Sequence, residues 1–287
     1  MPITEVLAAS PALFTAFASV LGLIVGSFLN VVIHRVPKML EAEFRHECAC
    51  LDLPDDAEPP ARPVYNLVLP RSACPHCNTP IAGYDNIPVV SWLLLRGRCR
   101  HCKAPISVRY PAIELLSGVL TACAAAHFGF GMAALGAMCF VWTMIALFFI
   151  DADTFLLPDS ITLPFLWLGL GFNLAGTYVT LPHAVVGAMG GYLCLWLVYW
   201  AFKLITGKEG MGYGDFKLLA GLGAWLGWQS LPVIILLSSV AGSLIGIALV
   251  LLSRLGWNTR LPFGPYLAVA GVAALFWGPA LQTLIWH

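Results

Sequence analysis

Long apolar runs alternate with short polar stretches along most of this chain. Each run approaches the roughly 20 residues that a helix needs to cross the hydrocarbon core of a bilayer. We predict spans at residues 10–33, 111–127, 130–150, 160–180, 183–206, 231–253 and 262–285. A shorter apolar stretch, 216–228, brings the number to eight if it crosses. It is too short to span untilted, so re-entry is the alternative.

Composition supports the membrane assignment. The chain is 59% hydrophobic and 10% charged, whereas soluble domains are about 25% charged. An ordinary soluble domain is therefore excluded. The first apolar segment lacks the basic start and the cleavage site of a signal peptide, so we expect it to be retained. The expected fold class is an all-α polytopic membrane protein surrounded by lipid, with no nucleic-acid partner and no indicated oligomeric state.

The positive charges predict an orientation, because Lys and Arg mark cytoplasmic loops. Ten of the 15 lie between Arg35 and Arg109. The other five are Lys203, Lys208, Lys217, Arg254 and Arg260. All 15 fall on the cytoplasmic side if the N-terminus is external and there are eight crossings. A re-entrant 216–228 would leave Arg254 and Arg260 outside.

This pattern divides the chain into three parts. Residues 1–33 hold the first span, 34–110 form a polar cytoplasmic insert, and 111–287 form a membrane bundle. The insert is rich in Pro and Gly and shows little long helical periodicity, so we expect a small loop-rich module. A module of that size buries a limited core and needs a further stabilising element.

Two CxxC pairs supply such an element. Cys74 and Cys77 form the first pair, and Cys99 and Cys102 form the second. Four thiolates at this spacing are typical of a tetrahedral zinc site, and a four-cysteine site is structural because it leaves no open position. Two disulfides or free thiols are the alternatives, but disulfides are rare in the cytoplasm.

Two carboxylates are candidates for chemistry. Asp151 follows a long apolar run and Asp215 precedes the short one, so the predicted topology places both at the cytoplasmic face. Two adjacent carboxylates cannot both ionise cheaply, and such a pair can activate water against a peptide carbonyl. The glycines before Asp215 permit close backbone approach. The alternative is a pair of aspartates that mark span ends and face water.

Neighbouring polar residues have open roles. Asp153 is able to tune Asp151, and Asp159 is expected to be a loop carboxylate or an N-cap. Lys217 is able to lower the pKa of Asp215.

Three more polar residues lie near the first two spans. Asn30 and Arg35 are predicted to hold substrate or cofactor, although an interfacial Arg that snorkels explains Arg35 equally well. Glu114 lies just inside a span and needs a polar partner or a basic substrate segment.

Several motifs resemble one family from end to end. They are Gly26–Pro37 (GSFLNVVIHRVP), Arg71–Cys77 (RSACPHC), Arg98–Cys102 (RCRHC), Arg109–Glu114 (RYPAIE), Ile150–Asp159 (IDADTFLLPD), Gly212–Leu218 (GYGDFKL) and Pro262–Tyr266 (PFGPY). In this order they resemble the bacterial type 4 prepilin peptidases, also called leader peptidases with N-methyltransferase activity.

The resemblance implies an intramembrane aspartic endopeptidase of the GxGD type in the bacterial inner membrane. Such an enzyme removes the leader of type IV prepilins and type II secretion pseudopilins and methylates the new N-terminal residue with S-adenosylmethionine. Carried over by motif, Asp151 and Asp215 are the catalytic pair, and Cys74, Cys77, Cys99 and Cys102 are the zinc ligands. The cofactor-binding residues are not indicated, because the glycines at 210, 212 and 214 follow no strand and open no nucleotide-binding unit.

Two other classes compete with the protease. A transporter or channel predicts carboxylates near mid-span, whereas these lie at span ends. A zinc-stabilised scaffold without chemistry does not need the aspartate pair. The number of matching motifs favours the protease.

Overall fold

A computed structural model describes residues 3–51, 64–253 and 261–286. Within these ranges the secondary structure is helical, apart from isolated β-bridges. The helices are α1 (Ile3–Ala9), α2 (Pro11–Leu51), α3 (Val90–Leu94), α4 (Arg109–Phe128), α5 (Met132–Thr154), α6 (Asp159–Leu174), α7 (Leu181–Thr206), α8 (Tyr213–Leu226), α9 (Leu231–Ser253) and α10 (Gly264–Trp286). Two short 3₁₀ helices are η1 (Gly83–Asn86) and η2 (Trp228–Ser230). The all-α expectation is confirmed.

Each predicted apolar stretch contains a helix, but the stretch predicted to reach residue 180 is helical only to Leu174. Six helices are long and apolar enough to cross a membrane. These six segments are Pro11–Leu51, Arg109–Phe128, Met132–Thr154, Leu181–Thr206, Trp228–Leu252 and Gly264–Thr283. The other two apolar helices are α6 with 16 residues and α8 with 14. At 1.5 Å per residue they are about 24 and 21 Å long, short of the hydrocarbon thickness. The expected count of about eight is therefore approximate.

The chain forms two compact units. One contains Phe17–Leu120, and the other contains Met1–Ala16 together with Thr121–His287. Arg254 and Arg260, which entered the charge argument, lie outside the described residues.

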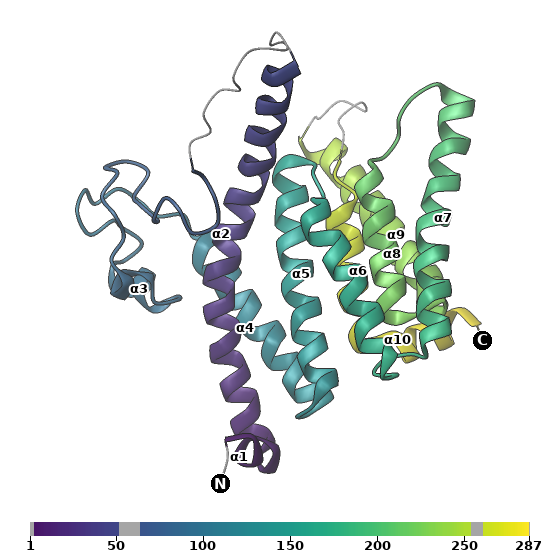
Figure 1. Cartoon of the computed structure of the whole chain (residues 1–287), viewed down its shortest axis with the longest axis horizontal. Coiled ribbons are helices and arrows are strands. Elements are labelled where there is room, and N and C mark those ends of the chain that lie inside the picture. Colours follow the sequence, from purple (N-terminus) through teal and green to yellow (C-terminus); the bar gives the residue numbers. More distant parts are fainter. Residues whose placement is uncertain (1–2, 52–63, 254–260, 287) are drawn as a thin grey trace. The chain divides into compact units, whose positions relative to one another are not determined.

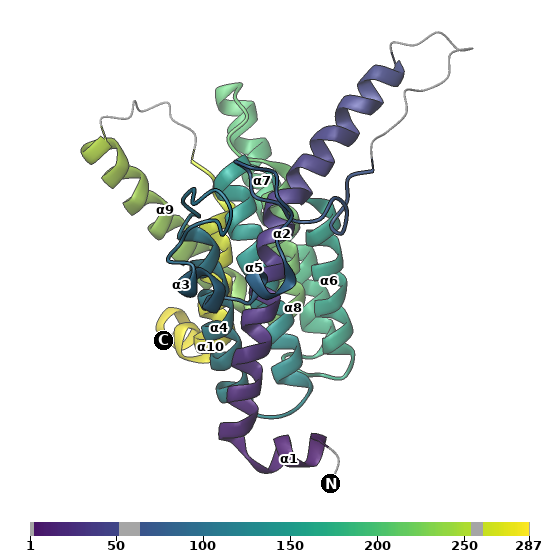
Figure 2. The ribbon, with the colours of Figure 1, turned by 90° about the vertical axis from the view of Figure 1, so that its left-hand side faces the viewer.

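In the unit of residues 17–120, α2 continues well beyond the predicted end of the first span at residue 33. It is a single helix to Leu51 (Figures 1 and 2). The residues after Pro37 include many good helix formers, which favour this extension. The first part of the predicted insert is thus helical, and the loop-rich character begins further along the chain. Residues 64–108 contain only η1, α3 and isolated bridges.

Small residues bring α2 and α4 into contact. A Cβ on Gly26 would lie 2.7 Å from the Glu114 Cα, and the Ser117 hydroxyl donates to the Gly22 carbonyl at 2.7 Å. Close backbone approach of this kind is the usual role of a small-xxx-small pair in membrane helices. Gly22 and Gly26 therefore act as packing residues between α2 and α4.

In the second unit, α8 is the buried centre of the helix bundle. It packs mainly between α6 and α7 (Figure 1). Where α7 packs against α8, glycines of α7 leave no room for a side chain. A Cβ on Gly187 would lie 2.3 Å from the Gly223 carbonyl oxygen. A Cβ on Gly191 would lie 2.5 Å from the Leu219 carbonyl oxygen. Protein surrounds this short helix, so it does not need the length of a lipid-facing span. Whereas α8 packs closely along α7, α9 tilts away from it (Figure 2).

Contacts at both ends show that α8 runs the whole length of α6 in the same direction. Near its start, the Lys217 ammonium group donates to Asp159, the first residue of α6. Near its end, the Asn173 side chain at the end of α6 donates to the carbonyls of Ala224 and Trp225. The chain then continues through η2 into α9 from the far end. This path agrees with a crossing of 216–228.

Candidate active site

Asp151 lies in the last turn of α5. The helix ends at Thr154, and the next residue, Phe155, has a φ of 57° in the left-handed region and an N–H that bonds to the Asp151 carbonyl at 2.9 Å. Such a conformation is uncommon for a bulky residue and turns the chain sharply. Asp151 itself is only 5% exposed. A buried carboxylate at the end of an apolar helix requires polar neighbours.

Asp215 lies in the first turn of α8 and is also buried, with 7% exposure. The preceding residue, Gly214, packs against Leu157 so closely that a Cβ would lie 2.6 Å from the Leu157 Cβ. The glycine is therefore required for close approach, as predicted. The Asp215 N–H donates to the Gly212 carbonyl at 3.3 Å.

The two carboxylates come together at one end of the bundle. They are near enough to interact electrostatically, and Gly264 at the start of α10 donates its N–H to Asp151 Oδ2 at 3.0 Å. The Leu157 side chain lies between Gly214 and Gly264. If each glycine carried a Cβ, the Leu157 Cδ1 atom would be 3.4 Å from the one on Gly214 and 3.2 Å from the one on Gly264. Three helices thus contribute to one buried acidic site.

This burial contradicts the alternative in which both aspartates merely face water. A second negative charge beside the first is costly in a medium of low dielectric constant, so a pair of neighbouring buried carboxyl groups favours the singly ionised state in general. One group then holds a proton and the other accepts one, which is the arrangement that polarises a carbonyl and activates water. Catalysis by this pair remains a prediction.

The polar residues around the pair differ in part from expectation. Lys217 donates to both oxygens of Asp159 at 2.7 Å, and it does not contact Asp215. The prediction that Lys217 tunes Asp215 is therefore wrong in this structure. Asp159 is the first residue of α6, whose N-cap is Pro158, so its predicted capping role is also wrong. Asp153 is exposed.

The four cysteines of the CxxC pairs form a second candidate site. The Sγ atoms of Cys74, Cys77, Cys99 and Cys102 all lie within 4.8 Å of one another. The Cys74 and Cys102 sulfurs are 3.8 Å apart, close to the roughly 3.8 Å edge of a tetrahedron with zinc–sulfur bonds of 2.3 Å. All four thiols are free, which contradicts the alternative of two disulfides. The donor set fits a tetrahedral thiophilic ion.

Each CxxC pair lies in a turn of the same design. In the first, the Cys74 N–H bonds to the Thr79 carbonyl and Asn78 has a φ of 54°. The second repeats this arrangement with Cys99, Ala104 and Lys103. Hydrogen bonds to Thr79 lower the pKa of Cys77 to about 6, and the thiolate is the form that binds metal.

An ion pair joins the second CxxC turn, which contains Arg100, to Asp85 of η1. The Arg100 guanidinium donates to both oxygens of Asp85, with Nε 2.9 Å from Oδ2, and it holds the pKa of that carboxyl below its usual range. The metal-binding turn is thereby attached to its neighbour.

The candidate residues of the first two spans have structural contacts. Arg35 is 8% exposed and donates to the carbonyls of Asn66 and Pro70, so its interpretation as a snorkelling residue is wrong. Asn30 donates to the Tyr110 carbonyl. Glu114 is buried and accepts a hydrogen bond from the Val89 N–H, which provides the polar partner that its position requires.

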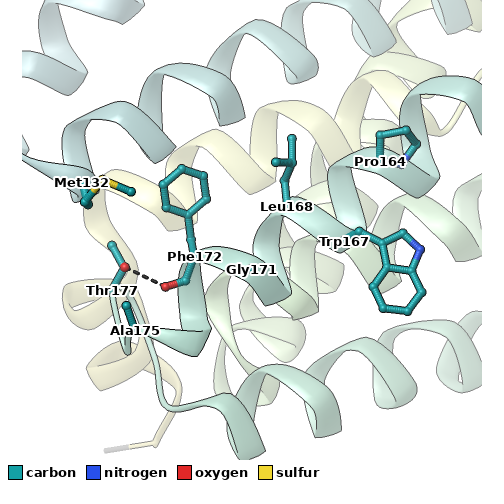
Figure 3. A pocket seen from close by; sticks show the side chains of 8 residues that line it. All are labelled: Met132, Pro164, Trp167, Leu168, Gly171, Phe172, Ala175 and Thr177. Carbon is teal, nitrogen blue, oxygen red and sulfur yellow. Dashed lines mark hydrogen bonds between the residues drawn. The ribbon is translucent and has the colours of Figure 1, made fainter.

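Two hollows of the bundle lie away from the carboxylates. One, of about 480 Å³, is lined by apolar side chains of α6 with Met132 and Thr177 (Figure 3). The other, of about 740 Å³, lies between α7 and α9. Neither is lined by Asp151 or Asp215. Apolar surface of this kind is expected where a helix faces lipid.

Sequence reasoning gave no role to Gly264 and Leu157. Both belong to motifs that carried the family resemblance, PFGP and IDADTFLLPD, but an isolated glycine and leucine in apolar surroundings carry no chemical signal. The contact of Gly264 with Asp151, and that of Leu157 with Gly214 and Gly264, arise from tertiary packing.

Comparisons with known proteins agree with this architecture. Residues 20–128 match the bacterial peptidase A24 N-terminal domain, and residues 138–247 match the type IV leader peptidase family. The chain is 55% identical to a prepilin leader peptidase/N-methyltransferase of Aeromonas hydrophila, over 94% of this chain and 93% of the relative. Proteins of the same name from Stutzerimonas stutzeri (53% identity, 97% and 96% coverage) and Pseudomonas aeruginosa (51%, 97% and 95%) are similarly close. No solved structure matches the chain.

Proposed function

The chain belongs to the bacterial type IV leader peptidase family, and from that membership we propose that it removes the leader of type IV prepilins and N-methylates the new N-terminus. We extend the proposal to the pseudopilins of type II secretion and to S-adenosylmethionine as methyl donor. The relatives match almost the whole chain, so both activities are proposed for one polypeptide.

One observation carries the peptidase proposal: Asp151 and Asp215 are buried together at one end of the bundle. In the proposed mechanism, one carboxylate accepts a proton from a water molecule as the water attacks the scissile carbonyl. The other carboxyl group donates its proton to the carbonyl oxygen. Breakdown of the tetrahedral intermediate returns a proton to the leaving amine and regenerates the shared-proton pair.

Positive charges support a cytoplasmic position for the end of the bundle that carries Asp151 and Asp215. Lys203 is in the last turn of α7 and donates to Glu209 in the loop that leads to Asp215, while Lys217 is in the first turns of α8. The loops at the opposite end, 129–131, 175–180 and 227–230, contain no Lys or Arg. By the positive-inside rule the aspartate end faces the cytoplasm of a multi-pass inner-membrane protein. A substrate with a cytoplasmic leader and an apolar helix would present its cleavage site at this depth.

We propose that Cys74, Cys77, Cys99 and Cys102 hold a structural zinc ion in residues 17–120. The ion would supply a cross-link to a segment with little regular structure. It has no part in peptide hydrolysis, because four thiolates leave no position for water or substrate.

The peptidase proposal is tested by replacing Asp151 or Asp215 with Asn in the full chain. Each change keeps the size of the side chain and removes the titratable group, so we expect cleavage of a prepilin to fall by at least about a thousandfold. Asp153→Asn is the matched control, since it removes an exposed carboxylate of the same helix. Wild-type cleavage by a correctly inserted Asp151→Asn or Asp215→Asn protein would disprove the catalytic pair.

A further inference from the structure

Gly264 is the residue of α10 that reaches the aspartates. Its N–H is directed at Asp151 Oδ2 with an N···O distance of 3.0 Å, and both groups are buried. The N–H groups of Tyr266 and Leu267 already bond to the Phe263 carbonyl, and Pro265 has no N–H. Among these residues, the Gly264 N–H is therefore the donor available to a carboxylate at the start of the helix.

The missing side chain of Gly264 matters as much as its N–H. A Cβ at this position would lie 2.6 Å from Asp151 Oδ2 and 3.0 Å from its Cγ. Carbon–oxygen contacts this short do not occur, so any other residue would displace the carboxylate or the start of α10. The space that a side chain would fill is the space that the Asp151 carboxylate occupies.

We propose that Gly264 is a positioning residue of the active site, which fixes the Asp151 carboxylate relative to Asp215. This inference rests on the proposed catalytic pair. Asp151 is in the last turn of α5, beside a sharp turn, and the N–H from α10 holds one of its carboxylate oxygens in place. The carboxylate separation is thereby set by the packing of three helices and not by one flexible side chain.

Leu157 completes the arrangement. It lies between Gly264 and Gly214, the residue before Asp215, and meets the space beside both glycines. Each aspartate thus has an adjacent glycine, and one leucine separates the two glycine-bearing segments. A larger residue at either glycine would alter the distance across the pair.

The decisive experiment measures kcat and KM for prepilin cleavage by purified full-length Gly264→Ala protein. A misplaced carboxylate affects the chemical step, so we expect kcat to fall by about a hundredfold or more with KM changed less than about threefold. Gly271→Ala is the matched control: it lies on the same helix, and its Cβ would meet the Leu222 side chain at 2.5 Å, away from the carboxylates. We expect this control to lower the melting temperature but to leave kcat within about threefold of wild type.

A second variant covers the case in which Gly264→Ala fails to fold. An ester at the bond between Phe263 and Gly264, introduced as glycolic acid by nonsense suppression, removes the N–H and adds no side chain. We expect kcat to fall by about tenfold, the usual effect of losing one hydrogen bond to a charged group. Unchanged kcat in the ester variant, or in folded Gly264→Ala protein, would overturn the inference.

Asp151→Asn, assayed in parallel, separates the two ideas. If Asp151→Asn is inactive while both Gly264 variants are normal, only the positioning role fails. If Asp151→Asn cleaves normally, the proposed catalytic pair fails instead.

Discussion

Lys217 and Asp159 form a two-point ion pair that joins the first turns of α8 and α6. The ammonium nitrogen lies 2.7 Å from each carboxylate oxygen, and the side chains are 29% and 55% exposed. Lys217 follows Asp215 by two residues, so the pair restrains the turn that carries this aspartate. At this exposure such a pair contributes little to global stability, about 0.2–1 kcal/mol.

The first prediction follows from this position. Replacing Lys217 by Met keeps the length of the side chain and removes the ion pair, so we expect cleavage activity to fall about two- to fivefold with a melting temperature close to wild type. Asp159→Asn should have a similar effect, and the double variant should lose no more than either single one. Additive losses would show that the two residues act independently.

A second prediction concerns Glu114 and an unusual turn at Val89. Val89 has φ 60° and ψ −48°, and the N–H of Val90 bonds back to the Pro88 carbonyl, which is the rare γ-turn with positive φ. The Glu114 Oε2 atom accepts the Val89 N–H at 2.7 Å. A β-branched residue adopts this conformation only where its surroundings enforce it.

Replacing Glu114 by Leu leaves the Val89 N–H without its acceptor. We expect the free energy of unfolding to fall by about 1–3 kcal/mol, with faster amide exchange around residues 87–95. Glu114→Gln retains a carbonyl acceptor and should lose less. Glu41→Gln, which removes an exposed carboxylate of α2, serves as the control. Equal exchange in all three variants would contradict a role for Glu114 in holding the turn.

The cysteine cluster gives a third prediction. Gently purified protein should contain about one zinc ion per chain, released by replacing Cys74 and Cys77 with Ser. Loss of the cross-link should increase amide exchange across residues 64–108, while the bundle remains folded. Cys123→Ser is the control, because this exposed cysteine of α4 lies outside the cluster. Metal-free wild-type protein with the same exchange pattern would refute the structural-metal proposal.

The sequence was sufficient for features that depend on local composition. Apolar length located the six helices that are long enough to cross a membrane and also the shorter α6 and α8, and CxxC spacing selected the four cysteines that cluster. Tertiary packing decided the rest. The extension of α2 to Leu51 was not predicted, because its polar residues look like a loop in a hydropathy pattern although their helix propensity is high. Lys217 is two residues from Asp215 in sequence, but its position on α8 directs its side chain to Asp159. Gly264 is separated from Asp151 by more than 100 residues, and only the packing of α10 brings its N–H to the carboxylate.

The path of α8 leads to a prediction about topology. The helix α8 starts at the end of the bundle that carries the aspartates and finishes at the other end, where the Trp225 ring donates to the Phe165 carbonyl of α6. The helix α9 therefore begins at the end away from the aspartates. The end of α10 lies at that same end, because Gln282 bonds to Ser230. The α7–α8 loop, which contains Lys208, should therefore be cytoplasmic and the end of α10 external. A reporter inserted after Lys208 and one fused after His287 should give opposite signals: cytoplasmic fluorescence at the first and periplasmic phosphatase activity at the second. A re-entrant α8 would place α9 and α10 in the reverse orientation, so cytoplasmic signals from both positions would contradict the crossing. An external signal after Lys208 would be more damaging, since it would put Asp151 and Asp215 on the side away from a cytoplasmic leader.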